Sequence, residues 1–168
     1  MFKQMFVFFL LTVSSMSFAD FDEKRLEVAR EVMLYNQDNW EEALLNYTDD
    51  VVYEDAIMNN DENNRYKIIG ISKLTRFMKN LFNFTVQDLV IEEEVYMDDT
   101  YMSTWKLSMY AKPLTKEIVV SGSTILKFRD NKVYYHRDFY SDSVIWEKIP
   151  FIGMGVKRLR KLHRGNAK

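Results

Sequence analysis

The chain has 168 residues, of which 47% are hydrophobic and 29% charged, and its formal net charge is −2. On a soft prior of about 100–200 residues per domain, this length accommodates one domain, and the composition excludes a disordered chain. The absence of cysteine excludes a disulfide framework, a thiolate metal site and a cysteine nucleophile. The chain is therefore expected to fold as one domain without disulfide or thiol chemistry.

The first 19 residues have the pattern of a secretory signal peptide. Lys3 precedes an apolar run over residues 5–13, and Ser17 and Ala19 fit the small-x-small rule for signal peptidase. The run is too short to span a bilayer, which takes about 20 residues. We therefore expect cleavage after Ala19 and an exported protein, periplasmic or secreted. A buried N-terminal helix and an uncleaved anchor are the alternatives.

The first half of the mature chain shows helical spacing of apolar residues and one strand-like alternation. These patterns predict helices over residues 22–35, 39–47 and 72–82, a strand over residues 49–56 and a polar loop over residues 58–65. The second half contains four strand-like runs, Val86–Met97, Thr100–Ala111, Glu117–Phe128 and Lys132–Tyr140. Helices followed by a meander of strands predict an α+β fold, with N-terminal helices packed on a curved antiparallel sheet.

The C-terminal residues 157–168 hold six Lys or Arg and no acid. An acidic domain with a basic tail lacks the broad basic face of a nucleic-acid binder, so no nucleic-acid partner is expected. Val156, Leu159 and Leu162 could form an apolar stripe that makes weak contact with a membrane surface. A solvated C-terminal helix is the alternative.

The last two predicted strands and the segment after them contain Gly122–Phe128 (GSTILKF), Lys132–Tyr140 (KVYYHRDFY) and Ile149-Pro150. These runs resemble those of bacterial SnoaL-like proteins of unassigned activity. The order of helices and strands likewise resembles the nuclear transport factor 2-like superfamily, which includes ketosteroid isomerases and SnoaL-like polyketide cyclases. The resemblance implies a cone-shaped fold with an internal hydrophobic cavity. The expected division is a signal peptide (1–19), a SnoaL-like domain (20–148) and a C-terminal segment with the basic tail (149–168).

A comparison with the isomerases is possible position by position. The resemblance places Asp55 where ketosteroid isomerases keep the carboxylate that moves the substrate proton. Glu31 falls at the position of their oxyanion-holding tyrosine, and Thr124 falls near that of their protonated aspartate. Because only one of the three positions matches, steroid isomerisation by that mechanism is not expected.

Strand alternation places His136, Asp138 and Tyr140 on one face together with Tyr134, while Arg137 and Phe139 point the other way. By the resemblance, the His136 face lines the cone, where a desolvated carboxylate becomes a usable base near neutral pH. The candidate catalytic residues are Asp55, His136 and Asp138, and the candidate ligand-binding residues are Tyr53, Trp105, Leu107, Met109 and Tyr140. Alternatively, His136 and Asp138 bond to each other and fix the sheet, and Asp55 caps the following loop.

The sequence favours neither metal nor cofactor chemistry. It has two histidines and no carboxylate cluster at ligand spacing, so neither a metal nor another cofactor is expected. It also lacks the G-x-S-x-G elbow of serine hydrolases and a phosphate-binding glycine loop.

Three functions remain open. The first is a cofactor-free isomerase, cyclase or dehydratase that acts on a small hydrophobic molecule. The second is a non-catalytic exported module that binds a lipid-like or aromatic ligand. The third is an interaction protein whose sheet forms a homodimer. A homodimer is expected from the resemblance and from strand tyrosines that would otherwise be exposed, namely Tyr96, Tyr101, Tyr110 and Tyr135.

Overall fold

The computed structural model describes residues 23–55, 67–111, 117–141 and 143–148. The predicted signal peptide, the polar loop over residues 58–65 and the basic tail lie outside these residues. Within the described ranges, no helix is long and apolar enough to cross a membrane.

The helices largely follow the apolar spacing of the sequence. The first is helical over residues 23–33, and the second predicted helix is divided into α2 (Trp40–Ala43) and a 3₁₀ helix, η1 (Leu44–Asn46). The longest, α3 (Ile71–Phe84), buries Leu74 and Met78 on its apolar face. The residue before α3 has a φ of +92°, a backbone conformation that favours the glycine found there, Gly70. A short helix, α4 (Ser143–Trp146), was not predicted.

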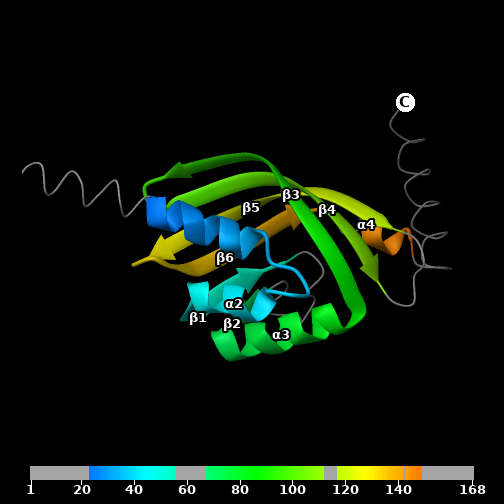
Figure 1. Ribbon diagram of the computed structural model, residues 1–168, viewed down its shortest axis with the longest axis horizontal. Helices are drawn as coiled ribbons and strands as arrows, with labels where there is room; N and C mark the ends of the chain where they lie inside the picture. The colour runs from blue at the N-terminus through cyan, green and yellow to red at the C-terminus, as the bar shows by residue number, and fades with distance from the viewer. Residues whose placement is uncertain (1–22, 56–66, 112–116, 142, 149–168) are drawn as a thin grey trace, which may run out of the picture.

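Six strands form one curved sheet in the order β2-β1-β6-β5-β4-β3 (Figure 1). The strands are β1 (Tyr47–Glu54), β2 (Lys67–Ile69), β3 (Thr85–Met97), β4 (Thr100–Ala111), β5 (Ile118–Arg129) and β6 (Lys132–Tyr140). The short strand β2 was not predicted. β1 and β6 pair in parallel, so the expectation of an antiparallel sheet is wrong for this pair, which brings the first and last strands side by side.

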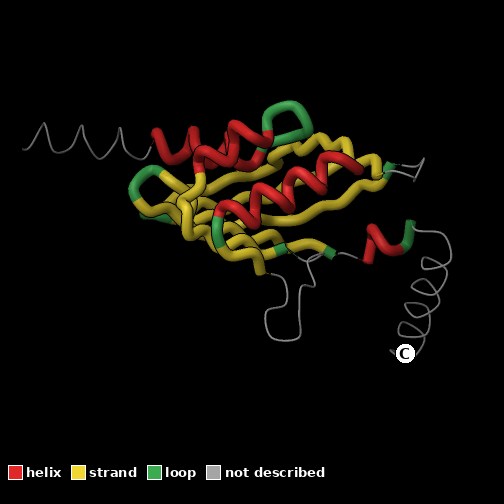
Figure 2. The backbone as a smooth tube through the Cα atoms, turned by 90° about the horizontal axis from the view of Figure 1, so that it is seen from below, coloured by secondary structure: helices red, strands yellow, loops and turns green. Residues whose placement is uncertain are grey.

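The first helix and α3 lie along one side of the curved sheet (Figure 2). The hydrophobic core lies between these helices and the inner face of the strands, and it includes Val32, Leu74, Tyr101 and Leu126, each fully buried. Helices packed on one face of a curved sheet confirm the predicted α+β class and the cone-shaped arrangement.

A bulge in β3 turns Tyr96 to the inner face of the sheet. The pairing with β4 shifts between Ile91 and Glu93, so the alternation of β3 changes face beyond that point. Tyr96 then lies opposite Tyr101, and Tyr101 is completely buried while Tyr96 packs against the core. Tyr101 lies four residues before Trp105 on β4, so regular alternation already places it on the inner face. The expectation that Tyr96 and Tyr101 lie on the outer face is therefore wrong.

A second bulge lies in β6 at Tyr134, because Lys127 pairs with Tyr135 while Phe128 pairs with Val133. Val133 is fully buried, and the Arg129 guanidinium lies 5.4 Å from the centre of the Tyr134 ring. Tyr134 therefore does not share the face of His136, contrary to expectation. The bulge precedes His136, so the alternation from there to Tyr140 is the predicted one.

Candidate functional site

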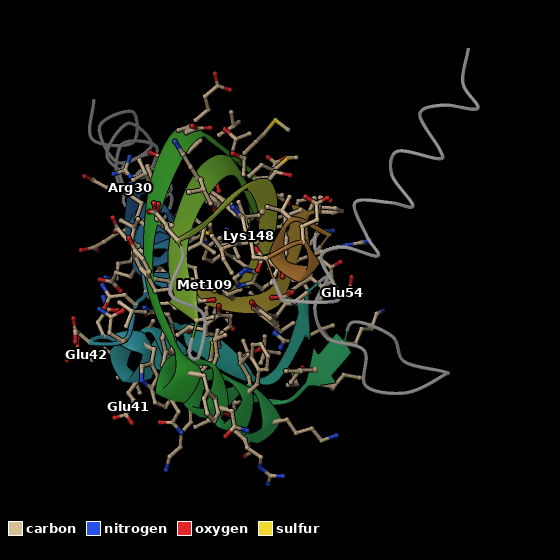
Figure 3. All side chains as sticks on the ribbon, turned by 90° about the vertical axis from the view of Figure 1, so that its right-hand side faces the viewer. Arg30, Glu41, Glu42, Glu54, Met109 and Lys148 are labelled. Carbon is tan, nitrogen blue, oxygen red and sulfur yellow. The ribbon has the colours of Figure 1, made fainter. Side chains whose placement is uncertain are left out.

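The inner face of the sheet and the helices enclose a pocket of about 120 Å³. Its lining includes all eight residues singled out from the sequence: Tyr53, Asp55, Trp105, Leu107, Met109, His136, Asp138 and Tyr140. They come from β1, β4 and β6 and from the residue that follows β1. Figure 3 shows the strands curving around the interior, with Met109 inside the curve. Period-two alternation within each strand, joined to the parallel pairing of β1 and β6, brings these residues together.

Asp138 is the centre of a hydrogen-bond network. Its Oδ1 accepts hydrogen bonds from His136 Nε2, at 3.1 Å, and from the Thr124 hydroxyl, while its Oδ2 accepts one from the Tyr53 hydroxyl at 3.1 Å. The indole Nε1 of Trp105 donates to Thr124 Oγ1 at 2.7 Å. The carboxylate is thus held by donors from three strands.

These donors decide the charge of Asp138. Burial on its own would raise the pKa of this carboxyl, but the adjacent His136 ring and the hydrogen bonds from His136, Thr124 and Tyr53 outweigh burial. The pKa of Asp138 therefore lies below its ordinary value, and the group is ionised at neutral pH.

Both ring nitrogens of His136 have partners. Nδ1 lies 2.7 Å from the Tyr47 hydroxyl, and Nε2 lies 3.1 Å from Asp138 Oδ1. Because an ionised carboxylate only accepts, Nε2 carries a proton and donates to Asp138. The ring is 1% exposed and meets Tyr53 edge-on at 4.6 Å. His136 is therefore placed to orient Asp138.

Asp55 follows β1 directly and lies beside the same network. Its Oδ1 accepts a hydrogen bond from the Tyr140 hydroxyl, and its Oδ2 lies 3.4 Å from the Tyr53 hydroxyl. The single Tyr53 proton can thus bond to Asp138 or to Asp55. Burial and the neighbouring carboxylates raise the pKa of Tyr53 and of Tyr140 far above the usual range, so both stay protonated and act as donors.

The remaining walls of the pocket are aromatic and apolar. The rings of Trp105 and Tyr140 lie 5.9 Å apart at a tilt of 58°. Gly122 lies between them, because it pairs with Trp105 on one side and with Tyr140 on the other. Other walls come from the helices and from β3 and β5, and include Val32, Phe77, Leu89 and Val120. A largely apolar pocket with a few convergent polar groups is typical of a small-molecule site.

Sequence reasoning missed several residues of this site. Tyr35 lines the pocket, whereas Glu31, one helical turn earlier, is exposed and bonds to Asn46. Tyr35 lies four residues after Glu31, so helical spacing could have indicated Tyr35 as a residue of the pocket. The resemblance placed Thr124 near an isomerase aspartate but did not indicate that the Thr124 hydroxyl donates a hydrogen bond to Asp138. Gln87 also lines the pocket, and its Nε2 is buried with no hydrogen-bond partner among the described residues.

Among the residues that the structure describes, no group of three or more His, Asp or Glu side chains could hold a metal ion. The polar groups of the pocket are instead two carboxylates, an imidazole, tyrosine hydroxyls and an amide.

The fold belongs to the nuclear transport factor 2-like class. The chain is similar to an LEH-like epoxide hydrolase of M. tuberculosis (11% identity, 76% of this chain and 90% of that chain, TM-score 0.62). It is also similar to a protein of Jannaschia sp. CCS1 named as a SnoaL-like polyketide cyclase (15% identity, 78% of this chain and 94% of that chain, TM-score 0.64). A third similar structure is a phenazine biosynthesis-related protein of Pseudomonas aeruginosa (12% identity, 77% of this chain and 87% of that chain, TM-score 0.65). At these identities the likeness concerns the fold.

The family model of the SnoaL-like domain matches residues 28–136 of this chain. The chain belongs to the SnoaL-like family. No protein of curated function matches it. Because the three similar structures carry different names on one fold, the reaction must be argued from the pocket itself.

Proposed function

We propose that this protein binds a small, largely apolar molecule in the pocket between the inner face of the sheet and the helices. The supporting observation is the contrast between an aromatic and apolar lining and a single polar corner, where Asp55 and Asp138 share the Tyr53 hydroxyl. The described donors of that corner already bond to other side chains of the site. A preformed pocket with a fixed polar corner favours binding of one orientation of a ligand.

Proton transfer on the bound molecule, without a cofactor, is the second candidate function. It would make the protein an isomerase, cyclase or dehydratase with Asp55 as the base. The observation that favours it is the position of the Tyr53 hydroxyl, 3.4 Å from Asp55 and 3.1 Å from Asp138. A proton taken up by one carboxyl group could be balanced by a shift of the Tyr53 hydrogen bond toward the other.

A pocket-filling variant tests the binding function. We expect Leu107→Trp to reduce the amount of small molecule that mass spectrometry detects after the purified protein is denatured, because the larger ring occupies the space. Lys106→Trp is the matched control, since Lys106 is exposed and its neighbour Leu107 lines the pocket. Equal amounts of the same molecule from both variants and from the wild type would contradict the proposal.

Deuterium exchange tests the catalytic candidate. In D₂O, the wild type should introduce deuterium into the molecule recovered from the pocket, whereas Asp55→Asn should not. For a catalytic role, the variant should keep a thermal stability near or above that of the wild type, because a neutral amide of the same size removes the cost of burying a charge. A loss of about 1.5–3 kcal/mol in the free energy of unfolding, the value for a buried hydrogen bond to a charged group, would instead indicate a structural role. Asp49→Asn, an exposed carboxylate on the same strand, is the control.

A further inference from the structure

We infer that the side-chain amide of Gln87 donates a hydrogen bond to a neutral acceptor oxygen of the bound molecule, at the end of the pocket away from Asp55 and Asp138. This inference rests on the proposed binding function and adds the group by which the protein distinguishes its ligand from other apolar molecules of similar size. It depends on three features of the described pocket: an unpaired donor, the apolar surroundings of that donor and its separation from the polar corner.

Gln87 brings to the pocket a donor that the protein itself does not use. Of the described residues that line the pocket, Gln87 alone has a buried side-chain nitrogen or oxygen without a hydrogen-bond partner, and that atom is the amide Nε2. The Tyr140 hydroxyl and the Trp105 indole, by contrast, donate to other side chains of the site. A buried N–H group without a partner costs free energy. An acceptor on the ligand would recover that free energy.

The backbone of Gln87 is held on two sides. Its N–H group donates to Gln37 Oε1 at 3.3 Å, and the residue pairs with Met109 of the neighbouring strand β4. The side chain therefore starts from a fixed point on the inner face of β3 before any ligand binds. A donor that is already in place makes its bond to a ligand at a lower entropic cost.

The surroundings of Gln87 favour an acceptor without charge. Met109 lies opposite Gln87, and the next inward pair consists of Leu89 and Leu107, all four residues lining the pocket. No Lys or Arg is among the described lining residues, and one neutral amide does not compensate for the burial of an anion. An N–H group of a ligand would face another donor at Nε2. A neutral oxygen, such as that of a carbonyl group, accepts the bond without introducing a charge.

Gln87 and the polar corner lie at different ends of the pocket. The row of Asp138 crosses β4 at Ser103, whereas Gln87 pairs with Met109, six residues after Ser103. Six residues of strand span roughly 20 Å. The oxygen held by Gln87 is therefore not the group beside Asp55, so Gln87 selects and orients the ligand and takes no part in a proton transfer at Asp55.

Two probes of the same shape test the inference. Acetophenone and α-methylstyrene differ only in a carbonyl oxygen that replaces a CH₂ group, and both suit the pocket volume of about 120 Å³, since an engineered cavity of roughly 150 Å³ holds benzene. Calorimetry or ligand-observed NMR gives the ratio of their affinities. In Gln87→Met, which keeps the length of the side chain and removes the donor, acetophenone should lose affinity relative to α-methylstyrene by roughly three- to tenfold, the scale of a neutral hydrogen bond.

A control variant and a spectroscopic measurement accompany this comparison. Asp88→Met, at the exposed neighbouring position of β3, should keep the affinity ratio of the wild type. Infrared spectroscopy of acetophenone bound to the wild type should show the carbonyl stretch at a lower frequency than in an apolar solvent, because a hydrogen bond weakens the C=O bond. This measurement needs no variant and stands even if Gln87→Met fails to fold. A carbonyl stretch at the frequency of the apolar solvent would overturn the inference.

The outcomes separate this inference from the proposed function. An affinity ratio that is unchanged in Gln87→Met, with binding of both probes lost in Leu107→Trp, would overturn the role of Gln87 and leave the binding function standing. Recovery of a co-purifying molecule that contains no acceptor atom would do the same. Binding of acetophenone that survives in both Gln87→Met and Leu107→Trp would place the probe outside the pocket and overturn the inference. Failure of both probes to bind the wild type would overturn it as well, whereas the binding function would still be judged by the molecule that co-purifies.

Discussion

At the scale of single residues, the lowered pKa of Asp138 links the site to the stability of the fold. Its carboxyl group is a stronger acid in the folded chain because His136, Thr124 and Tyr53 stabilise the ionised form against burial. A carboxyl whose folded pKa lies below its unfolded value, about 3.9, stabilises the fold fully above that value. The contribution is lost as the pH falls from about 3.9 through the folded pKa.

Asp138→Asn is expected to lower the free energy of unfolding at pH 7 by about 2–3 kcal/mol, since it removes hydrogen bonds to a charged group. The variant should also lose the part of the acid destabilisation that begins as the pH falls toward 4. Urea unfolding between pH 3 and pH 7 measures both effects. Asp49→Asn should leave the pH profile of the wild type nearly unchanged. Parallel pH profiles for Asp138→Asn and the wild type would show that the carboxyl group is not selectively stabilised.

The sequence could place the site residues but not their partners. Alternation along a strand depends only on neighbouring positions, so the residues that share a face with Tyr53, Trp105 or Asp138 were predictable. The resemblance to the nuclear transport factor 2-like superfamily then indicated which face is the inner one. The bond between Tyr47 and His136 joins residues 89 positions apart, and it follows from the pairing of β1 with β6, which local patterns do not encode. A bond between His136 and Asp138 was one of the alternatives drawn from the sequence, whereas the contact of Tyr47 with His136 Nδ1 emerged only from the three-dimensional arrangement.

At the scale of elements, three neighbouring strands build one wall of the pocket around a missing side chain. Gly122 of β5 leaves room for the Trp105 ring of β4 and lies beside Tyr140 of β6. A Cβ atom at this position would lie 2.5 Å from two carbons of the Trp105 ring and 2.7 Å from the carbonyl oxygen of Phe139. The position of the indole, and thus its bond to Thr124, depends on this glycine.

Gly122→Ala is expected to lower the free energy of unfolding by about 1–3 kcal/mol, as overpacking does, and to displace the Trp105 ring. Thermal unfolding measures the first effect and near-ultraviolet circular dichroism the second. Adding Trp105→Phe should recover part of the stability in a double-mutant cycle, because the smaller ring leaves room for the methyl group. Strictly additive effects would mean that the indole is not what limits the space.

The bounds of strands were predicted well where turn residues delimit them, whereas bulges inside the strands were not predicted. The bounds of β4 and β6 match the predicted runs, because turn residues delimit them on both sides. The bulges at Glu92 and Tyr134 became visible only through the register with the neighbouring strand. The strand β2 has three residues, too few for alternation to stand out beside a polar loop.

At the scale of the whole molecule, the outer face of the sheet remains apolar. Met102, Tyr110, Val119 and Phe139 are 38–51% exposed, and they lie on the face opposite the pocket. A hollow over this face is lined by Val95, Met102, Ile125 and Phe139 among others. Exposed apolar patches of this kind mark interaction surfaces. We therefore expect the homodimer to form through this face.

Light scattering at micromolar concentration should give twice the mass of a single chain, which is 20.1 kDa before any processing. Phe139→Glu should shift the mass toward one chain, because it introduces a charge into the apolar face. Leu45→Glu, at a residue 73% exposed outside that face, is the control and should leave the mass unchanged. A single-chain mass for the wild type would contradict the expected dimer.

Export is a separate prediction for the whole chain. Protein recovered from the native envelope or medium should begin at Asp20, since Ser17 and Ala19 match the processing rule. N-terminal sequencing measures this directly. A cytosolic protein that retains residues 1–19 would contradict the predicted signal peptide.

The parallel pairing of the first and last strands also has a consequence for how the chain acquires its structure during synthesis. Tyr53 and His136 meet in this pair, so the pocket cannot close until β6 has been made and has reached β1. Closing so long a segment of chain is entropically slow. Until then β1 presents an unpaired edge, which other chains can join. A nascent or truncated chain that ends before Tyr140 would therefore be prone to aggregation as well as unable to bind.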